Sequence, residues 1–576
     1  MFNFQEVQDC FSSKNRNPEI VEEANGEPCY GTEDSEESVS NFHQCSDTGF
    51  YKDNSSKGSL GFLPQQQEAF LDFGPFDDTR YNILSPPLQT CLKEIEKFGE
   101  IKNGIQDHDQ TKKTNQKDQL SSTSLKLLKR YVEGLKRLNS ERIIKPINDT
   151  PSMEVPSQEL STEKIVRVAG ERFIQTFTRT VDIVSMLDNP FDLSFSGLSV
   201  DEAKKVELAE LLLLSAEKVG NQQYERASIL LNQCDRLSSS TGNAVERVVH
   251  YFCKALRERI DRETGKSLGK QHCFNIDEAI MAPSSTILAS YQEVPFSQVA
   301  HFAGIQAIVE NVTDAKRIHV IDLGIRVGVQ WTGLMQALVS DFDCNLELLK
   351  ITAVGTTSKH LIKDTGKRLT SFAESISLPF AFNIVMVSDM LDLTEDQFEL
   401  DSDQTVVVYC EYLLRSLISL PDRLNSVMKV IRILNPSITV VTEPEYNSTS
   451  SSFVNRFIEA LFYFSAYFDC LESCMKDNSN RMILESLHFG EGIKNIVATE
   501  GKERKIRNAK LDAWRAFFTR FGMLETELST SSLCQAKLIA KKFACGNACT
   551  LSMDGKSLLI GWKGTPMHSL SAWKFI

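Results

Sequence analysis

The chain lacks the short cysteine motifs that mark many metal-binding and redox proteins. Its 14 cysteines are scattered, and no two of them form a Cys-x-x-Cys pair, which excludes the usual paired zinc-ligand spacing. No apolar run typical of a secretory signal peptide follows Met1. No stretch approaches the ~20 apolar residues that a membrane-crossing helix needs, and the nearest, at residues 208–214, is short. These absences predict reduced thiols in a soluble, intracellular protein with no membrane partner.

Motifs for catalysis are also missing. The sequence contains neither a Gly-x-Ser-x-Gly elbow nor a lysine-containing phosphate loop. His301 has no Cys or Asp nearby at metal-ligand spacing, so we interpret it as a core or interface histidine rather than a ligand. We therefore expect no catalytic residues, no cofactor and no metal site, and a protein that is not an enzyme.

Positive charge is in short supply. The chain has 63 Lys and Arg against 77 Asp and Glu, which gives a formal net charge of -14. Because nucleic-acid binding is dominated by basic side chains that neutralise phosphates, this balance argues against a surface that binds DNA over its whole area. A local basic groove stays possible. Residues 502–507, Lys-Glu-Arg-Lys-Ile-Arg, are the candidate for it, and a solvated helix is the alternative.

The first 162 residues lack a sustained helical or strand period. Residues 1–162 are rich in Ser, Asn, Gln and charged side chains, too polar to offset the entropy of an ordered chain, so we predict that they are largely disordered. Within them, residues 70–78 mix aromatics with carboxylates, which is typical of docking or activation segments and equally compatible with a linker. Residues 125–138 form a basic amphipathic stretch, which predicts a partner-binding helix, a nuclear-import signal or a solvated surface helix.

The rest of the chain shows regular apolar periods. Helical spacing predicts a helical lead-in at residues 163–200 and a helical cap at about 201–302. From about 303 to 576, short apolar runs alternate with helical patterns, which indicates a parallel sheet covered on both faces. The Asp554-Gly555 pair between two strand-like runs predicts a hairpin. The fold class is thus α/β and Rossmann-like (class I methyltransferase-like): a mostly parallel sheet with an antiparallel C-terminal hairpin, an α-helical cap and a long disordered N-terminus.

The turn after the first strand decides whether such a core can hold a methyl-donor cofactor. Arg326 stands where the central glycine of an Asp-x-Gly-x-Gly-x-Gly turn would lie, and its side chain is expected to crowd the cofactor. The second strand ends without the carboxylate that would bind a ribose. Gly324 and Gly328 are explained by a tight turn alone. We expect Asp322 to cap a helix or a buried backbone group rather than a ligand.

Five ordered blocks of sequence resemble those of the GRAS family, the plant regulators that include DELLA and SCARECROW proteins. They lie at residues 206–231, 295–338, 351–380, 442–515 and 562–573. The signature strand resembles Ile318-His319-Val320-Ile321-Asp322, and the final block contains Trp562 and Ser571-Ala572-Trp573. We expect both sets to be structural. The resemblance makes residues 201–576 a GRAS domain, and the receptor-binding motifs of DELLA proteins are not found upstream of it.

The resemblance implies a nuclear transcription regulator that acts through protein contacts. Its expected partners are other GRAS proteins, in homo- or heterodimers, and DNA-binding transcription factors, so that DNA contact is more often indirect than direct. Leu208, Leu211 and Leu212 form a Leu-x-x-Leu-Leu string that could enter a hydrophobic groove of a partner; the alternative is that they pack the cap. A sequence-specific DNA-binding factor is the second hypothesis, and a methyltransferase that binds S-adenosylmethionine is a remote third.

Overall fold

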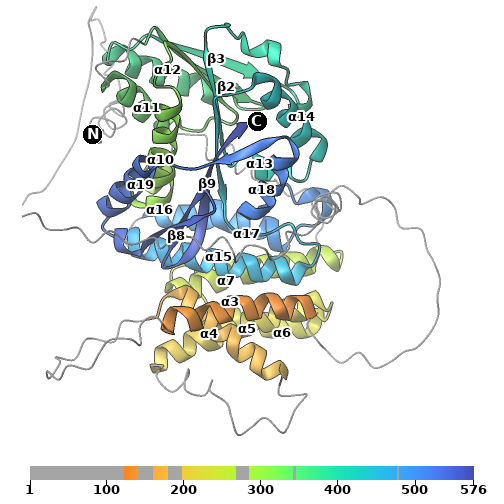
Figure 1. The fold of residues 1–576 in the computed structure, drawn as a ribbon. Helices are drawn as coiled ribbons and strands as arrows, with labels where there is room; N and C mark the ends of the chain where they lie inside the picture. The colour runs from red at the N-terminus through yellow and green to blue at the C-terminus, as the bar shows by residue number, and fades with distance from the viewer. Residues whose placement is uncertain (1–121, 141–159, 179–197, 267–284, 341–345, 477–478) are drawn as a thin grey trace, which may run out of the picture. The chain divides into compact units, whose positions relative to one another are not determined.

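A mixed sheet of nine strands forms the centre of the described chain (Figure 1). The computed structural model describes residues 122–140, 160–178, 198–266, 285–340, 346–476 and 479–576. The strands are β1 (Arg317–Asp322), β2 (Leu348–Gly355), β3 (Phe380–Met386), β4 (Thr405–Glu411), β5 (Ile438–Pro444), β6 (Met523–Thr526), β7 (Cys549–Asp554), β8 (Ser557–Trp562) and β9 (Thr565–Phe575). Their order is β3-β2-β1-β4-β5-β9-β8-β7, and β6 also pairs with β9.

The first five strands run parallel, and helices on both sides bury their faces. In β1, Ile318 and Val320 enter one apolar cluster, whereas Ile321 enters the other. Helices α10 (Pro295–Asn311), α11 (Val329–Ser340), α12 (Lys359–Ser375) and α19 (Thr530–Lys542) contribute to the first cluster. Helices α13 (Leu414–Leu417), α14 (Pro421–Leu434) and α18 (Leu511–Arg520), with the short turns η4 (Met390–Asp392) and η5 (Glu395–Phe398), contribute to the second.

The last strands run antiparallel, as the sequence predicts. β9 pairs with β5, β8 and β6 in antiparallel register, and β7 pairs with β8. The β7–β8 turn contains Gly555 at φ +58°, a left-handed conformation that glycine adopts without strain. The predicted fold class, a Rossmann-like and mostly parallel sheet with an antiparallel C-terminal hairpin, is confirmed.

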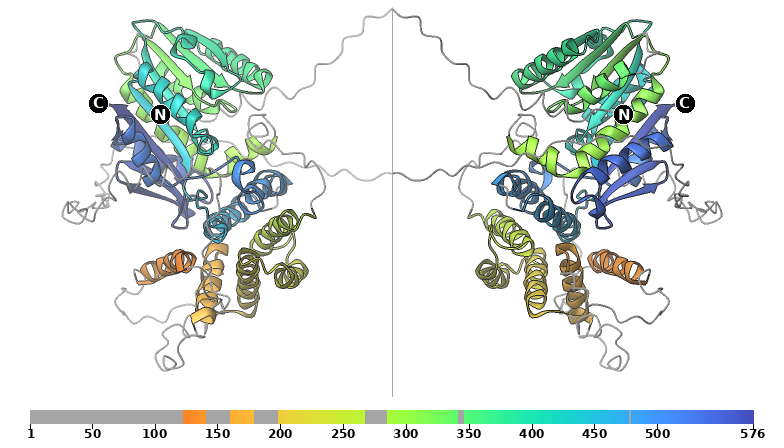
Figure 2. Two further views of the ribbon diagram at one scale, coloured as in Figure 1. Left: turned by 90° about the vertical axis from the view of Figure 1, so that its right-hand side faces the viewer. Right: turned by 90° about the vertical axis from the view of Figure 1, so that its left-hand side faces the viewer.

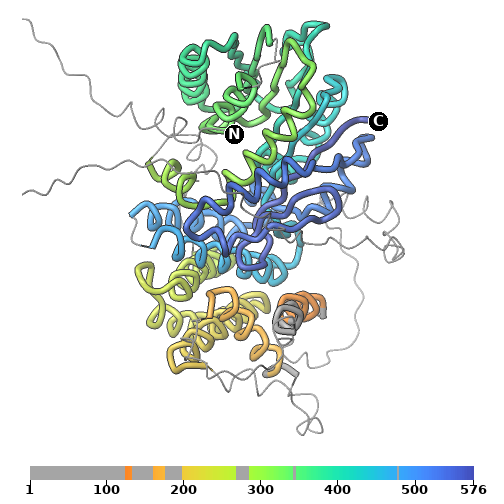
Figure 3. Tube along the Cα trace, turned by 60° about the vertical axis from the view of Figure 1, so that its left-hand side comes forward, coloured from red at the N-terminus to blue at the C-terminus, as the bar shows by residue number. Residues whose placement is uncertain are grey.

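A layer of helices packs on the long helix α15 (Phe453–Cys474), away from the parallel strands (Figures 1 and 2). It contains α3 (Ser122–Ser140), α4 (Thr162–Thr178), α5 (Val200–Gly220), α6 (Tyr224–Leu237) and α7 (Ala244–Glu263). α15 contacts α3, α4, α5 and α7. In Figure 3 these orange-to-yellow helices gather at one end, with the blue C-terminal strands between them and the green-to-cyan elements.

The start of α5 shows how the sequence sets one boundary of this layer. The Ser199 hydroxyl accepts a hydrogen bond from the backbone N of Glu202, and the Glu202 carboxylate accepts one from the backbone N of Ser199. This reciprocal capping box satisfies backbone donors that have no partner in the first turn of a helix. The same carboxylate accepts a bond from the backbone N of Leu160, so it also ties the approach to α4 onto α5.

Helix α3 lies inside the segment for which the sequence predicts mostly disordered chain. Residues 125–138 belong to it, and Leu128 and Val132 are buried against the helical layer. The solvated-helix interpretation is therefore wrong, because one face of α3 is covered. The acidic-aromatic stretch at residues 70–78 lies outside the described residues. The domain boundaries at 162, 200 and 302 stay predictions.

Smaller elements complete the described chain between α7 and β7. They are α9 (Ser285–Glu293), α16 (Ser479–Ile483), the π-helix η6 (Leu484–Phe489), α17 (Gly490–Val497), η7 (Gly501–Glu503) and η8 (Gly546–Ala548). Of these, α9 and η6 lie beside the carboxyl ends of β1, β4 and β5. No helix among the described residues has both the length and the apolar character to cross a membrane.

Candidate functional site

A cavity of about 210 Å³ lies at the carboxyl ends of β1, β4 and β5. The chain order reverses between β1 and β4, and in open α/β sheets ligands bind at this switch point. Its polar and aromatic lining consists of Ser290, Tyr291, Ser297, His301, Arg326, Gln330, Glu411, Tyr412, Arg415, Tyr463, Tyr467, His488, Phe489 and His568. The cavity is therefore the first place to look for a ligand.

The turn after β1 is built around Asp322. Its carboxylate accepts hydrogen bonds from the backbone N of Gly324 at 3.2 Å and from Nε1 of Trp331 at 2.9 Å. Burial raises the pKa of Asp322 to about 7, although the bond from Trp331 opposes this shift. The carboxylate thus caps backbone and fixes the tryptophan at the start of α11, in line with the structural role expected for it.

Arg326 occupies the wall of the cavity at the position of the missing glycine. Its guanidinium lies 4.9 Å from the ring centre of Tyr412. Gly328 has φ +75°, and a Cβ there would lie 2.8 Å from the Thr365 side chain, so this glycine is explained by packing. β2 ends at Gly355 and is followed by two threonines rather than an acid. The residues present do not fit S-adenosylmethionine, because both the open glycine cradle and the ribose-binding carboxylate are lacking.

A buried histidine and carboxylate face each other in the cavity. His301 Nε2 lies 3.1 and 3.2 Å from the two carboxylate oxygens of Glu411, and His301 Nδ1 lies 3.4 Å from the hydroxyl of Tyr291. Burial raises the pKa of Glu411, but the charges of His301 and Arg326 outweigh it and hold that pKa below its ordinary value. His301 is thus a paired core histidine, as predicted, that also lines a cavity.

Tyr412 follows directly after β4 in an unusual backbone conformation. Its φ is +57°, which is rare and strained for a residue with a large side chain. The conformation aims its hydroxyl at Nδ1 of His568, 3.1 Å away. Burial lowers the pKa of His568 to about 3, so its imidazole is neutral at physiological pH. The Arg415 guanidinium lies 5.3 Å from the centre of the Tyr412 ring, and its Nε donates to the Tyr412 carbonyl at 3.2 Å.

The sequence analysis missed most of this cavity. Glu411, Tyr412 and Arg415 are close together in the chain, whereas His568 lies 156 residues beyond Tyr412, and none of the four is a residue that the sequence motifs single out. The signal that could have found Glu411 is its position at the end of an apolar strand, where parallel strands present their ligand-binding residues. His568 carries no such signal, because β9 is a long antiparallel strand.

The predicted partner-binding leucines lie in the helical layer. Leu208 and Leu212 are buried, and Leu211 is half-buried against the same core. The three therefore pack α5 against its neighbours, so insertion into a partner would require α5 to leave the layer. Their role in partner binding stays a prediction. Among the large apolar residues of this leucine-rich block, Ile229 is exposed, with 62% of its surface accessible to solvent.

The signature strand is fully inside the protein. Ile318, Val320 and Ile321 belong to the two apolar clusters. His319 Nε2 lies 2.7 Å from the hydroxyl of Thr352 on β2, and burial lowers the His319 pKa to about 4. The geometry supports the structural role expected for this strand.

The final block holds the C-terminal strands in place. Trp562 Nε1 donates to the Asp469 carboxylate on α15 at 2.7 Å, and the ring is buried. Trp573 packs on Phe518 of α18 and donates to the hydroxyl of Ser571 at 2.9 Å. Ala572 is buried in register with Val440 of β5. These contacts support a structural role for the block.

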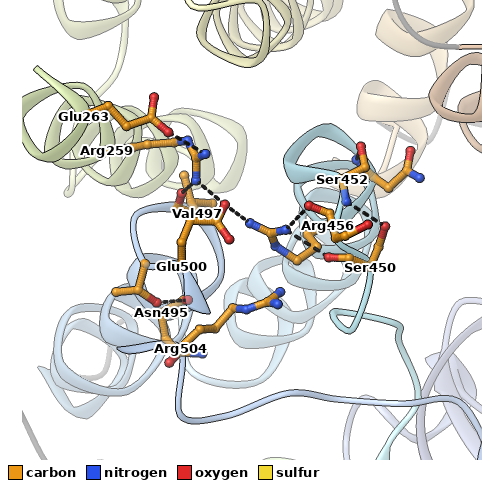
Figure 4. Close-up of polar contacts among 12 residues, drawn as sticks. Arg259, Glu263, Ser450, Ser452, Arg456, Asn495, Val497, Glu500 and Arg504 are labelled. Atoms are coloured by element: carbon orange, nitrogen blue, oxygen red, sulfur yellow. Dashed lines mark hydrogen bonds and ion pairs between the residues drawn. The ribbon is translucent and has the colours of Figure 1, made fainter. Parts of the chain in front are cut away.

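A group of arginines around Glu500 joins the helical layer to the rest of the protein (Figure 4). Arg259 of α7 donates to the Glu500 carboxylate at 2.8 Å, and Arg456 of α15 donates to the same oxygen. Because desolvation is outweighed by these two cations, the pKa of Glu500 is lowered. Glu500 therefore links two helices that are far apart in the chain.

The basic segment at residues 502–507 lies beside Glu500 and does not form a solvated helix. Arg504 and Arg507 are buried and donate to the backbone oxygens of Ser448 and Gly501 at 2.7 and 2.9 Å. The helical interpretation is wrong because these arginines satisfy backbone carbonyls of irregular chain. Arg504 and Arg507, two of the cations expected to form a DNA-binding groove, therefore stabilise the fold instead.

The fold and the site together define a protein with a methyltransferase-like fold, in which Arg326 stands in the turn after β1 in place of a glycine. Residues 208–574 match the model of the GRAS domain family. The chain belongs to the GRAS domain family, which confirms the resemblance of its sequence blocks.

Known proteins similar to this chain are plant regulators. DELLA protein RGL3 of Arabidopsis thaliana is 31% identical over 375 residues, which cover 65% of this chain and 70% of that protein. Scarecrow-like protein 18 of the same plant is 30% identical over 406 residues, covering 64% and 91%. The crystal structure of SCL7 in Oryza sativa aligns with a TM-score of 0.56 and 25% identity, over 64% of this chain and 99% of that one. The chain is therefore a GRAS-family plant regulator.

Proposed function

We propose that this protein is a nuclear co-regulator of transcription that binds other GRAS proteins and DNA-binding transcription factors. The observation that carries the proposal is family membership over residues 208–574. In this role the folded domain is a scaffold, and its output is regulation of plant development, hormone signalling or symbiosis. The acidic balance of the chain supports DNA contact through partners rather than directly.

We further propose that the protein is not an enzyme. Arg326 lines the position where a methyl-donor cofactor would need open backbone, and no acid follows β2. Among the described residues no group of three or more His, Cys, Asp or Glu side chains is placed to hold a metal. Calorimetry of the full chain with S-adenosylmethionine tests this: no binding is expected at ~1 mM, and saturable binding would overturn it.

The exposed apolar side chains of α6 are the partner-binding candidates that the structure leaves accessible. Ile229 is 62% exposed and Leu237 is 55% exposed, whereas Leu208 and Leu212 of α5 are buried and Leu211 is half-buried. A surface apolar residue is the kind of side chain that interfaces bury at their centre. We therefore move the proposed contact from α5 to the exposed side of α6, where Ile229 belongs to the same leucine-rich block and Leu237 lies just beyond it.

The test is affinity purification of the full chain from plant nuclei. The double variant Ile229→Asp/Leu237→Asp should fold and lose copurifying GRAS proteins or DNA-binding factors. Leu538→Asp is the matched control, because Leu538 is 53% exposed on a different helix, α19; it should retain them. Retention of every partner by the double variant would remove α6 from the proposal, and capture of no regulatory protein by the unaltered chain would remove the co-regulator role itself.

Direct sequence-specific DNA binding is the alternative function. It predicts that the purified chain binds promoter DNA alone, with an affinity that falls steeply as salt rises. The co-regulator proposal predicts weak or no binding of the isolated chain at physiological salt.

A further inference from the structure

The cavity at the carboxyl ends of the strands has features that the proposed regulatory function does not use. Its volume of about 210 Å³ exceeds that of an engineered apolar cavity of ~150 Å³ that binds benzene. Eight separate segments of the chain contribute to its wall, from α9 to β9. It is therefore large enough for one ring with a short side chain, and too small for a protein segment.

The charged groups that line the cavity favour an anion. Two guanidiniums, those of Arg326 and Arg415, face a single lining carboxylate, Glu411. That carboxylate already lies within 3.1 Å of His301. Two further acids do not line the cavity: Asp322 accepts bonds from Gly324 and Trp331, and Glu443 accepts one from the backbone N of Leu414 at 3.0 Å. Burial raises the pKa of Glu443 to about 7, and the charge of Arg415 opposes that rise, so Arg415 is partly balanced by this carboxylate.

A guanidinium is the group that best matches a carboxylate, since its planar N–H groups can donate two parallel hydrogen bonds. The guanidiniums of Arg326 and Arg415 lie 4.9 and 5.3 Å from the ring centre of Tyr412. The tyrosine thus holds both cations beside the cavity. A cationic ligand is disfavoured by the same pair.

The remaining lining is aromatic. Tyr291, Tyr463, Tyr467 and Phe489 contribute rings, and Tyr467 and Phe489 lie 4.4 Å apart between ring centres. Aromatic side chains pack edge-to-face or offset against a further ring. This wall suits a planar apolar body attached to the anionic group.

Three local irregularities meet at the cavity. Tyr412 has a strained positive φ, and the wall segment Leu484–Phe489 is a π-helix, a rare form that is frequent at functional sites. His568 Nε2 is buried without a hydrogen-bond partner among the described residues, although buried polar atoms are nearly always bonded. Each of these three features costs stability. A bound ligand that forms a hydrogen bond with Nε2 of His568 would offset the cost of leaving that atom unpaired.

We propose that this cavity binds a small aryl carboxylate, with its carboxylate on Arg326 and Arg415 and its ring against the tyrosines. The cavity lies where related folds bind a methyl donor. In this chain Arg326 takes part of that space, which leaves room for a smaller anionic ligand. Binding there would connect a small molecule to α9, α10, α15 and η6, which close over the strands. The inference does not depend on the partner proteins proposed above.

The test uses the full chain and four probes: benzoate, phenylacetate, 3-phenylpropanoate and 4-phenylbutanoate, each paired with its primary amide. Isothermal titration calorimetry should give a Kd below ~1 mM for at least one acid, and binding of the matching neutral amide should be at least ~10-fold weaker. The thermal midpoint should rise with the concentration of the same acid, because a ligand of the folded state stabilises it.

Arginine variants test whether Arg326 and Arg415 themselves bind the acid. Arg326→Met and Arg415→Met should each weaken acid binding at least ~10-fold, and Arg326→Lys should retain part of it. Arg520→Met is the matched control, because Arg520 is exposed on α18 and does not line the cavity; it should bind like the unaltered chain. Circular dichroism checks folding, and Arg326→Met alone decides if Arg415→Met does not fold.

Three results would overturn the inference. One is the absence of binding for all four acids at ~1 mM. Another is equal affinity for an acid and its amide, which would make the site a nonspecific apolar pocket. The third is unchanged acid binding in both arginine variants, which would place the ligand elsewhere.

Discussion

At the scale of single residues, Trp562 connects the C-terminal strands to α15. Its Nε1 donates to one oxygen of the Asp469 carboxylate, whose other oxygen accepts a bond from the backbone N of Thr162 at 3.0 Å. Trp562→Phe keeps most of the ring and removes the donor, so we expect a loss of about 1–3 kcal/mol in the free energy of unfolding. Trp562→Ala should lose about 3–5 kcal/mol, because it also leaves a cavity.

Chemical denaturation of the full chain measures both losses. Leu538→Ala is the control, since an exposed residue should change the free energy of unfolding by less than ~0.5 kcal/mol. A Trp562→Phe variant as stable as the unaltered chain would show that the bond to Asp469 does not stabilise the fold.

His568 makes a second prediction, about pH. Burial holds its pKa at about 3, whereas an unfolded histidine titrates near ~6.5. As the pH falls, the unfolded chain takes up the proton first, so the contribution of neutral His568 to stability is complete above ~6.5 and is lost as the pH falls toward 3. Between pH ~7.5 and ~5 the unaltered chain should lose about 2 kcal/mol more than His568→Gln does. Parallel losses in urea denaturation at both pH values would show that His568 is protonated in the folded state.

At the scale of elements, the parallel strands were predictable from the sequence, and the packing of α3 on the folded domain was not. β1, β4 and β5 are buried on both faces, and such strands appear in the sequence as short continuous apolar runs. α3 has a narrow apolar side within a polar region, and its stability depends on α15, more than 300 residues further along the chain. The sequence pattern around α3 gives no information about a contact with a helix so distant in the chain.

Tyr131 tests whether α3 belongs to the folded domain. Its ring stacks on Phe462 with 4.3 Å between ring centres, and its hydroxyl donates to Glu459 at 2.6 Å. Tyr131→Ala should therefore lower the free energy of unfolding by about 2–5 kcal/mol, although Tyr131 lies outside the family match at residues 208–574. Lys129→Ala, an exposed change on the same helix, should have little effect, and equal effects of the two changes would contradict the packing of α3.

At the scale of the whole molecule, the sequence predicted the fold class and family but not the cavity. The turn at Arg326 could be predicted because it is local. The cavity could not, because His301, Glu411 and His568 are brought together only by the order of the strands. The leucines of α5 show the opposite case. Their motif is visible in the sequence, but the structure places them mostly inside the helical layer.

The central claim is that this GRAS protein regulates genes through the DNA-binding proteins it associates with. The most direct measurement is its occupancy of chromatin in plant nuclei before and after depletion of a DNA-binding factor that copurifies with it. The account predicts that occupancy is lost at the sites of that factor and that the amount of the protein is unchanged. Unaltered occupancy after depletion, together with binding of the purified chain to those sites, would contradict it.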